Sequence, residues 1–202
     1  FGEAAVLATA GNFNNHIGLP LTLLALRPQQ RYAVIEMGMN HFGELDALTR
    51  IARPDAALVN NALRAHIGCG FDGVGDIARA KSEIYRGLPE SGTALIPAED
   101  EYAEVFRAAC RALSLRQIEF GVDKGEVHAE NVQLLPLGCR FDLVWQDQRA
   151  AVELPVPGKH NVANAVAAAA LALQAGVGLP ESAAALAGFA NIKGRLQRKA
   201  GL

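Results

Sequence analysis

Short apolar runs alternate with segments of helical periodicity from residue 4 to residue 120. The apolar runs fall at residues 4–9, 32–36, 56–59, 93–96 and 117–120. The helical segments fall between them, at residues 17–26, 43–53, 76–88 and 101–113. Strands that alternate with helices predict an α/β fold with a doubly wound, mostly parallel sheet. Continuous apolar strands are typical of a sheet that helices cover on both faces.

The pattern changes at about residue 126. Residues 127–135, 139–146 and 150–156 are strand-like, and Phe141, Leu143 and Trp145 alternate along the second of these runs. The polar residues 146–148 suit a turn between the second and third runs. We therefore predict a small antiparallel sheet within residues 126–157, followed by helices at 162–175 and 181–188.

Composition excludes several classes of protein. The chain has 202 residues, of which 50% are hydrophobic, so it can bury one sizeable core or a core with a small subdomain. A net charge of −2 gives no basic surface for nucleic acid and no polybasic membrane signal. The longest apolar runs stay well short of the ~18 residues that a membrane-spanning helix needs.

Three cysteines, Cys69, Cys110 and Cys139, lie far apart in the sequence. They suit free thiols in a reducing compartment better than a disulfide framework or a zinc site. We therefore expect a cytoplasmic protein. The chain starts at Phe1 without an initiator Met and stops at Leu202 without a capped element, so we expect a piece of a longer protein.

Polar clusters follow the first three predicted strands. They occupy residues 12–16, 36–41 and 60–66, and they supply Asn, Glu and His side chains. In an open parallel sheet, ligands bind at the carboxyl ends of the strands, which makes a shared site at these clusters the leading hypothesis. The alternative for residues 11–18 is a plain turn, because Asn and Gly are common turn residues.

Lys81 is the most informative single residue. It falls on the apolar face of the predicted helix 76–88, with Ile77 and Tyr85 one turn to either side. Arg79 and Glu83 fall on the opposite face, at the spacing of an ion pair. Lys81 can extend its charge from the core edge to water, or it can point into the strand-end site as a cation or as a modified metal ligand.

Several stretches together resemble one enzyme family. Residues 11–24 begin Gly-Asn-Phe-Asn-Asn, residues 36–44 begin Glu-Met-Gly-Met-Asn-His, and Asn60-Asn61, Ala65-His66 and residues 80–84 follow in order. Residues 157–165 and 194–196 complete the set. This set resembles the MurF-type Mur ligases, the UDP-N-acetylmuramoyl-tripeptide–D-alanyl-D-alanine ligases of peptidoglycan precursor synthesis. The first two motifs are specific to that type within the Mur ligases.

The resemblance implies the central ATP-binding domain of an ATP-dependent amide-forming ligase, with a P-loop-NTPase-like fold. Its substrates would be ATP, the UDP-N-acetylmuramoyl-tripeptide and D-alanyl-D-alanine, and the reaction would pass through an acyl phosphate. Magnesium and cationic side chains would neutralise charge on the transferring phosphoryl group. We expect a monomer for the full-length form.

The resemblance also implies roles for individual residues. Glu36 and His66 would hold Mg²⁺, joined by Lys81 if it is N-carbamoylated, and Lys81 and His66 would be catalytic. Asn161, Asn164 and Arg195 would bind the nucleotide and its phosphates, and Asn14, Asn15 and His41 would face the substrate and the metal.

The chain departs from the family pattern in its phosphate-binding loop. A phosphate-binding loop of the form G-x-x-G-K-[ST] is absent from the printed sequence, since Gly158-Lys159 is followed by His160. We expect that loop upstream of Phe1 and a further domain after Leu202, so the 202-residue chain by itself should be inactive. Two alternatives stay open: another Mur-superfamily amide ligase, acting on folate or a poly-amino acid, and a non-catalytic nucleotide-sugar-binding or assembly module.

Overall fold

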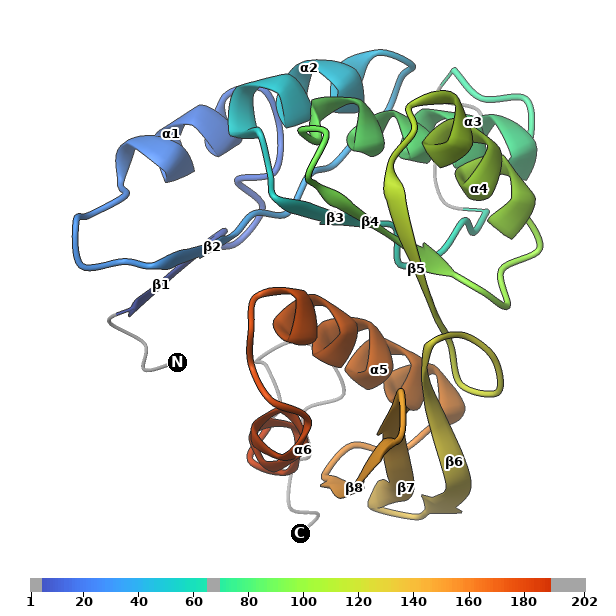
Figure 1. Ribbon diagram of the computed structural model, residues 1–202. Helices are drawn as coiled ribbons and strands as arrows, with labels where there is room; N and C mark the ends of the chain where they lie inside the picture. The colour runs from blue at the N-terminus through green and yellow to red at the C-terminus, as the bar shows by residue number, and fades with distance from the viewer. Residues whose placement is uncertain (1–4, 65–69, 190–202) are drawn as a thin grey trace, which may run out of the picture. The chain divides into compact units, whose positions relative to one another are not determined.

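The computed structural model describes residues 5–64 and 70–189 (Figure 1). The chain folds as two compact units. The first comprises Phe1–Ile96 and Asp100–Gln117, and the second comprises Pro97–Glu99 and Ile118–Leu202. Hydrogen bonds order the strands as β1-β2 in a two-stranded sheet and as β3-β4-β5-β6-β7-β8 in a six-stranded sheet. The predicted α/β class with a mostly parallel sheet is confirmed.

The first unit alternates strands with helices, as predicted. Its elements are β1 (Val6–Ala8), α1 (Gly18–Leu24), β2 (Tyr32–Val34), α2 (Glu44–Ala52), β3 (Ala56–Leu58), α3 (Val74–Ser82), the 3₁₀ helix η2 (Glu83–Gly87), β4 (Thr93–Pro97) and α4 (Ala103–Ala112). β5 (Arg116–Phe120) begins in the first unit and ends in the second. β1 pairs with β2 in parallel, and β3 pairs with β4 in parallel. In Figure 1, α1, α2, α3 and α4 lie on the same side of these strands.

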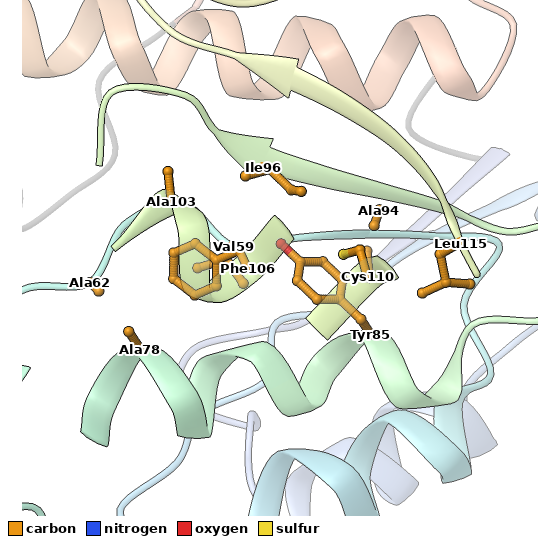
Figure 2. Packing of buried hydrophobic residues seen from close by; sticks show 11 residues of the cluster. Val59, Ala62, Ala78, Tyr85, Ala94, Ile96, Ala103, Phe106, Cys110 and Leu115 are labelled. Carbon is orange, nitrogen blue, oxygen red and sulfur yellow. The ribbon is translucent and has the colours of Figure 1, made fainter. Parts of the chain in front are cut away.

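Two buried clusters hold this unit together. In the first, Tyr85 and Phe106 pack against Val59 and Ile96, as Figure 2 shows. The Tyr85 hydroxyl donates a hydrogen bond of 2.9 Å to the Leu95 carbonyl, so the one polar atom of this side chain is satisfied inside the core. The second cluster joins α1, α2 and α3 through side chains that include Leu19, Leu48 and Ile77.

The second unit contains the predicted meander. β6 (Val127–Leu135), β7 (Gly138–Trp145) and β8 (Gln148–Leu154) pair antiparallel in sequence order. The meander is not a separate sheet, because Phe120 of β5 pairs in parallel with Val127 of β6. α5 (Lys159–Gln174) packs on β6 and β7, and α6 (Leu179–Ala187) packs on β7 and β8.

The burial of β2 differs from the sequence-based prediction. Its apolar run predicted a strand buried on both faces, yet Val34 is 58% exposed. Within the described residues, β2 pairs along one edge only, with β1, and more than half of Val34 stays exposed. The prediction that residues 32–36 form a strand buried on both faces is therefore wrong for this chain.

A stability comparison follows from this difference in burial. Ile96 is 0% exposed in the first core cluster, so Ile96→Ala should lower the free energy of unfolding by about 2–5 kcal/mol. Val34→Ala, at an exposed position, should change it by no more than about 0.5 kcal/mol. Urea unfolding of the two variants measures both values. An equally large loss for Val34→Ala would mean that this strand is covered.

Glu83 is a second correction. The helical pattern placed it on the solvent face beside Arg79, but Glu83 is only 5% exposed, and Arg79 pairs with Asp76 instead. The predicted helix 76–88 changes from α3 to the 3₁₀ helix η2 at Glu83. That change alters the angle between successive side chains, so a single α-helical projection cannot place the residues beyond Ser82. The apolar face itself is confirmed, since Ile77 and Tyr85 are both fully buried.

Candidate active site

Asn14 connects the first two polar clusters. Its side-chain amide donates a hydrogen bond of 2.8 Å to Oε1 of Glu36, just beyond β2. Its backbone carbonyl accepts a hydrogen bond of 2.7 Å from the Gly38 amide. A Cβ at Gly38 would lie 3.0 Å from the Asn14 side-chain amide, so the absence of a side chain there permits this close approach. The Asn-rich turn therefore fixes both the position and the orientation of Glu36.

Asn15 has a structural role at the start of α1. Its Oδ1 accepts hydrogen bonds from the amides of Ile17, at 3.1 Å, and Gly18, at 2.9 Å. These are amides at the start of a helix, which lack intrahelical partners. A Cβ at Gly18 would lie 2.3 Å from the Cα of Phe13, so the turn requires glycine at that position. The amide oxygen of Asn15 is thus engaged within the fold, and its NH₂ group is the part that could face a substrate.

His41 is exposed and interacts with Glu44. Its Nδ1 lies 3.2 Å from Oε1 of Glu44, and its side chain is 66% exposed. The Asn40 amide donates a hydrogen bond of 2.6 Å to the other oxygen of Glu44. That bond is the main cause of the lowered pKa of Glu44, with a further contribution from His41. Glu44 therefore stays ionised at the start of α2 and holds the 40–41 turn in place.

Lys81 points toward the loop that follows β3. Its Nζ donates a hydrogen bond of 2.5 Å to the Asn61 carbonyl. Burial lowers the pKa of Lys81, while the charge of Asp100 acts in the opposite direction. The sequence allowed two roles for Lys81: its ammonium could reach out to solvent, or it could face the strand-end cluster. The hydrogen bond to Asn61, which belongs to that cluster, favours the second role.

Asp100 was missed by the sequence analysis. Its two carboxylate oxygens accept hydrogen bonds from the amides of Ala62, at 2.7 Å, and Tyr102, at 2.8 Å. It therefore connects the loop after β3 to the start of α4, and it supplies the negative charge near Lys81. An Asp just before a helix is a recognisable capping signal, so the sequence could have indicated its local role.

Asn161 and Asn164, two of the expected nucleotide residues, belong to the second unit. The Asn161 side chain donates a hydrogen bond of 2.7 Å to the Pro157 carbonyl and closes the turn into α5, on which Asn164 also lies. Lys159 forms an ion pair of 2.6 Å with Asp123.

His66 and Arg195, expected at the metal and the phosphates, lie outside the described residues. The structure therefore joins Asn14 to Glu36 and Lys81 to Asn61, and it records no hydrogen bond from Asn15 or His41 to Glu36 or Lys81 among the residues it describes.

The side chains near Glu36 suit magnesium. A carboxylate beside an amide group, at an exposed strand end, offers the oxygen ligands that Mg²⁺ prefers. No group of three His, Cys, Asp or Glu side chains that could hold a metal ion occurs within residues 5–64 and 70–189. Magnesium is commonly held by one or two carboxylates together with substrate phosphates and water, and Glu36 offers one such carboxylate.

The lowered pKa of Lys81 can be tested in the chain itself. Only a neutral amine reacts with carbon dioxide, and Lys81 reaches that form at lower pH than Lys159, whose pKa its bond to Asp123 raises. With ¹³C-bicarbonate, Lys81 should give a carbamate NMR signal at a lower pH than Lys159 does. That signal should be absent in Lys81→Ala and retained in Lys159→Ala. Its persistence in Lys81→Ala would contradict the assignment.

Comparison with known proteins gives consistent matches. A family model, the Mur ligase middle domain, matches residues 2–172. The UDP-N-acetylmuramoyl-tripeptide–D-alanyl-D-alanine ligase of Haemophilus influenzae is 41% identical over 95% of this chain. The chain spans 41% of the length of that relative.

Solved structures match as well. A crystal structure of MurF from Acinetobacter baumannii has 42% sequence identity and a TM-score of 0.92, over 98% of this chain and 43% of that one. MurF from Thermotoga maritima in complex with ADP is 22% identical with a TM-score of 0.80, over 98% of this chain and 45% of that one, which is a likeness of fold.

Proposed function

Because the chain belongs to the Mur ligase middle domain family, we propose that it is the central ATP- and magnesium-binding domain of a D-alanyl-D-alanine-adding ligase. The observation that carries this proposal is the hydrogen bond from Asn14 to Glu36. It joins the two motifs that resemble the MurF type most specifically, and it places a carboxylate at the strand end where a nucleotide site is expected.

The proposed reaction forms an amide bond in two steps. The terminal carboxylate of the UDP-N-acetylmuramoyl-tripeptide attacks the γ-phosphorus of ATP, ADP leaves, and an acyl phosphate forms. The amine of D-alanyl-D-alanine then attacks the acyl carbon, and phosphate leaves with one of the original carboxylate oxygens as the amine loses a proton. Catalysis depends on positioning and on stabilising the charge of the phosphoryl group.

Each candidate residue has a place in this scheme. Glu36, His66 and a carbamoylated Lys81 would hold Mg²⁺, which would neutralise charge on the phosphate oxygens. Asn14 orients Glu36 through its 2.8 Å hydrogen bond. Asn15 and His41 would face the substrate. Asn161, Asn164 and Arg195 would contact the nucleotide.

The proposal includes a longer parent protein. The chain spans 41% of a relative at 41% identity, and its printed sequence contains no G-x-x-G-K-[ST] loop. We place that loop upstream of Phe1 and a further domain after Leu202.

Two alternatives make different predictions. Another Mur-superfamily ligase would release phosphate with a different acceptor, and an assembly module would bind a nucleotide sugar without releasing phosphate. The test is phosphate release by the full-length parent with ATP and Mg²⁺, with each substrate omitted in turn. We expect release only when both UDP-N-acetylmuramoyl-tripeptide and D-alanyl-D-alanine are present, and none from the 202-residue chain alone.

We propose a cytoplasmic, monomeric parent whose ligands are small molecules and not nucleic acid. Cys110 and Cys139 are free and buried, which is compatible with a reducing compartment. Within residues 5–64 and 70–189, no helix combines the length and apolarity needed to cross a membrane.

A further inference from the structure

We propose that Glu83 is a positioning residue that fixes the loop of Glu36–His41 against the helix of Lys81. The inference rests on the proposed function for its kinetic consequence, but its structural part stands on the chain alone. Glu83 is 5% exposed, and its two carboxylate oxygens lie 2.8 and 3.0 Å from the Gly43 amide nitrogen, which donates to both.

The site of this contact is the start of α2. Gly43 has a φ of +84°, a left-handed conformation that favours glycine, and it directly precedes Glu44, the first residue of α2. The carboxylate of Glu83 therefore meets the positive end of the α2 dipole and satisfies an amide that the helix itself cannot satisfy. Together these interactions stabilise a buried carboxylate that would otherwise be costly.

Backbone amides hold the loop between β2 and α2 near its start, in its middle and at its end. Near its start, Gly38 donates to the Asn14 carbonyl. In its middle, Asn40 donates to Glu44. At its end, Gly43 donates to Glu83, which is 40 residues away in the sequence. Only the last of these contacts connects the loop to the segment that carries Lys81.

Residues 81–83 thus join two predicted parts of the site. Lys81 contacts the loop after β3 through the Asn61 carbonyl, and Glu83 contacts the loop after β2 through Gly43. The helix changes from α3 to η2 at Glu83. Lys81 and Glu83, which hold the two loops, therefore lie next to this change, and the buried Tyr85 follows two residues later. Loss of the Glu83 carboxylate should therefore loosen the Glu36 loop while leaving the core beneath it intact.

Thr49 provides a matched control. Its hydroxyl donates a hydrogen bond of 2.7 Å to the Ile84 carbonyl, so it also joins α2 to η2. Thr49 lies in the C-terminal half of α2, away from the loop that precedes the helix. Thr49→Val removes that bond with little change in shape. A merely structural role for Glu83 would make Glu83→Ala and Thr49→Val behave alike.

The first arm of the test uses the 202-residue chain. Amide hydrogen exchange should speed up by about 10-fold or more at Gly43 and Asn40 in Glu83→Ala, but not in Thr49→Val. Glu83→Gln, which keeps one acceptor oxygen, should restore part of the protection. Unchanged exchange at Gly43 and Asn40 in Glu83→Ala would overturn the structural part, whatever the parent protein does.

The second arm uses the full-length ligase. Glu83→Ala should raise the KM for Mg²⁺ by about 10-fold to 100-fold while the KM for D-alanyl-D-alanine stays unchanged, because the loop carries the proposed magnesium carboxylate. Glu83→Gln should return the KM for Mg²⁺ most of the way to the wild-type value. An unchanged KM for Mg²⁺, or the same increase in Thr49→Val, would overturn the positioning role. A wild-type parent without ligase activity would refute the proposed function instead, and the exchange arm would still decide the structural part.

Discussion

Lys81→Ala in the full-length ligase is expected to lower turnover by about 100-fold or more. The side chain is half-buried, its Nζ is directed at the loop after β3, and its lowered pKa favours the neutral amine. A neutral amine can add to carbon dioxide, forming a carbamate and releasing a proton. The product is an anion that can bind magnesium where an ammonium cannot. Phosphate release at saturating substrates measures the loss.

Two further measurements separate a carbamate from a simple cation. Added short carboxylic acids should restore part of the activity of Lys81→Ala, because they can fill the vacated space with a carboxylate. Lys81→Arg should stay as inactive as Lys81→Ala, because a guanidinium keeps its positive charge. Full activity in Lys81→Arg would show that positive charge alone is needed and would contradict the carbamate.

Glu36→Ala is expected to lower turnover in the same ligase by about 10²–10³-fold, with the fold retained. Glu36 is exposed at the end of β2, so little packing is lost, but the oriented carboxylate that Asn14 holds is removed. Raising the concentration of Mg²⁺ should recover only part of the rate. Glu153→Ala is the matched control, because Glu153 is an exposed carboxylate in the second unit, paired with Arg140.

Near-normal turnover of Glu36→Ala at saturating Mg²⁺ would remove Glu36 from the proposed site. Asn14→Ala provides an independent check on orientation. It leaves the carboxylate in place but removes its 2.8 Å hydrogen bond, so it should give a smaller loss of the same kind.

Local patterns predicted the elements of the fold well. The alternation of apolar runs and helical segments gave each strand and α-helix of the described structure to within a few residues, and β6 was predicted with its observed bounds, Val127–Leu135. These patterns depend on the spacing of side chains along the chain, which a sequence shows directly. They also placed Asn14 and Glu36 in polar clusters that follow the first two strands, and a hydrogen bond joins these two side chains.

Properties that depend on distant partners could not be predicted in this way. The exposure of Val34 depends on what covers β2, and the burial of Glu83 depends on Gly43, 40 residues away. Asn15 shows a related difficulty, because the same amide that could bind a substrate is used to satisfy the start of α1. A sequence shows the chemical capacity of such a side chain but not which partner it takes.

The fate of one carboxylate oxygen atom tests most directly whether the ligase activates the tripeptide carboxylate as an acyl phosphate. In the full-length ligase, the terminal carboxylate of the UDP-N-acetylmuramoyl-tripeptide can be labelled with ¹⁸O, and the released phosphate can be analysed by mass spectrometry. If this domain activates the carboxylate as an acyl phosphate, each turnover with D-alanyl-D-alanine should place one ¹⁸O atom in phosphate. Phosphate released without ¹⁸O during product formation would contradict the account.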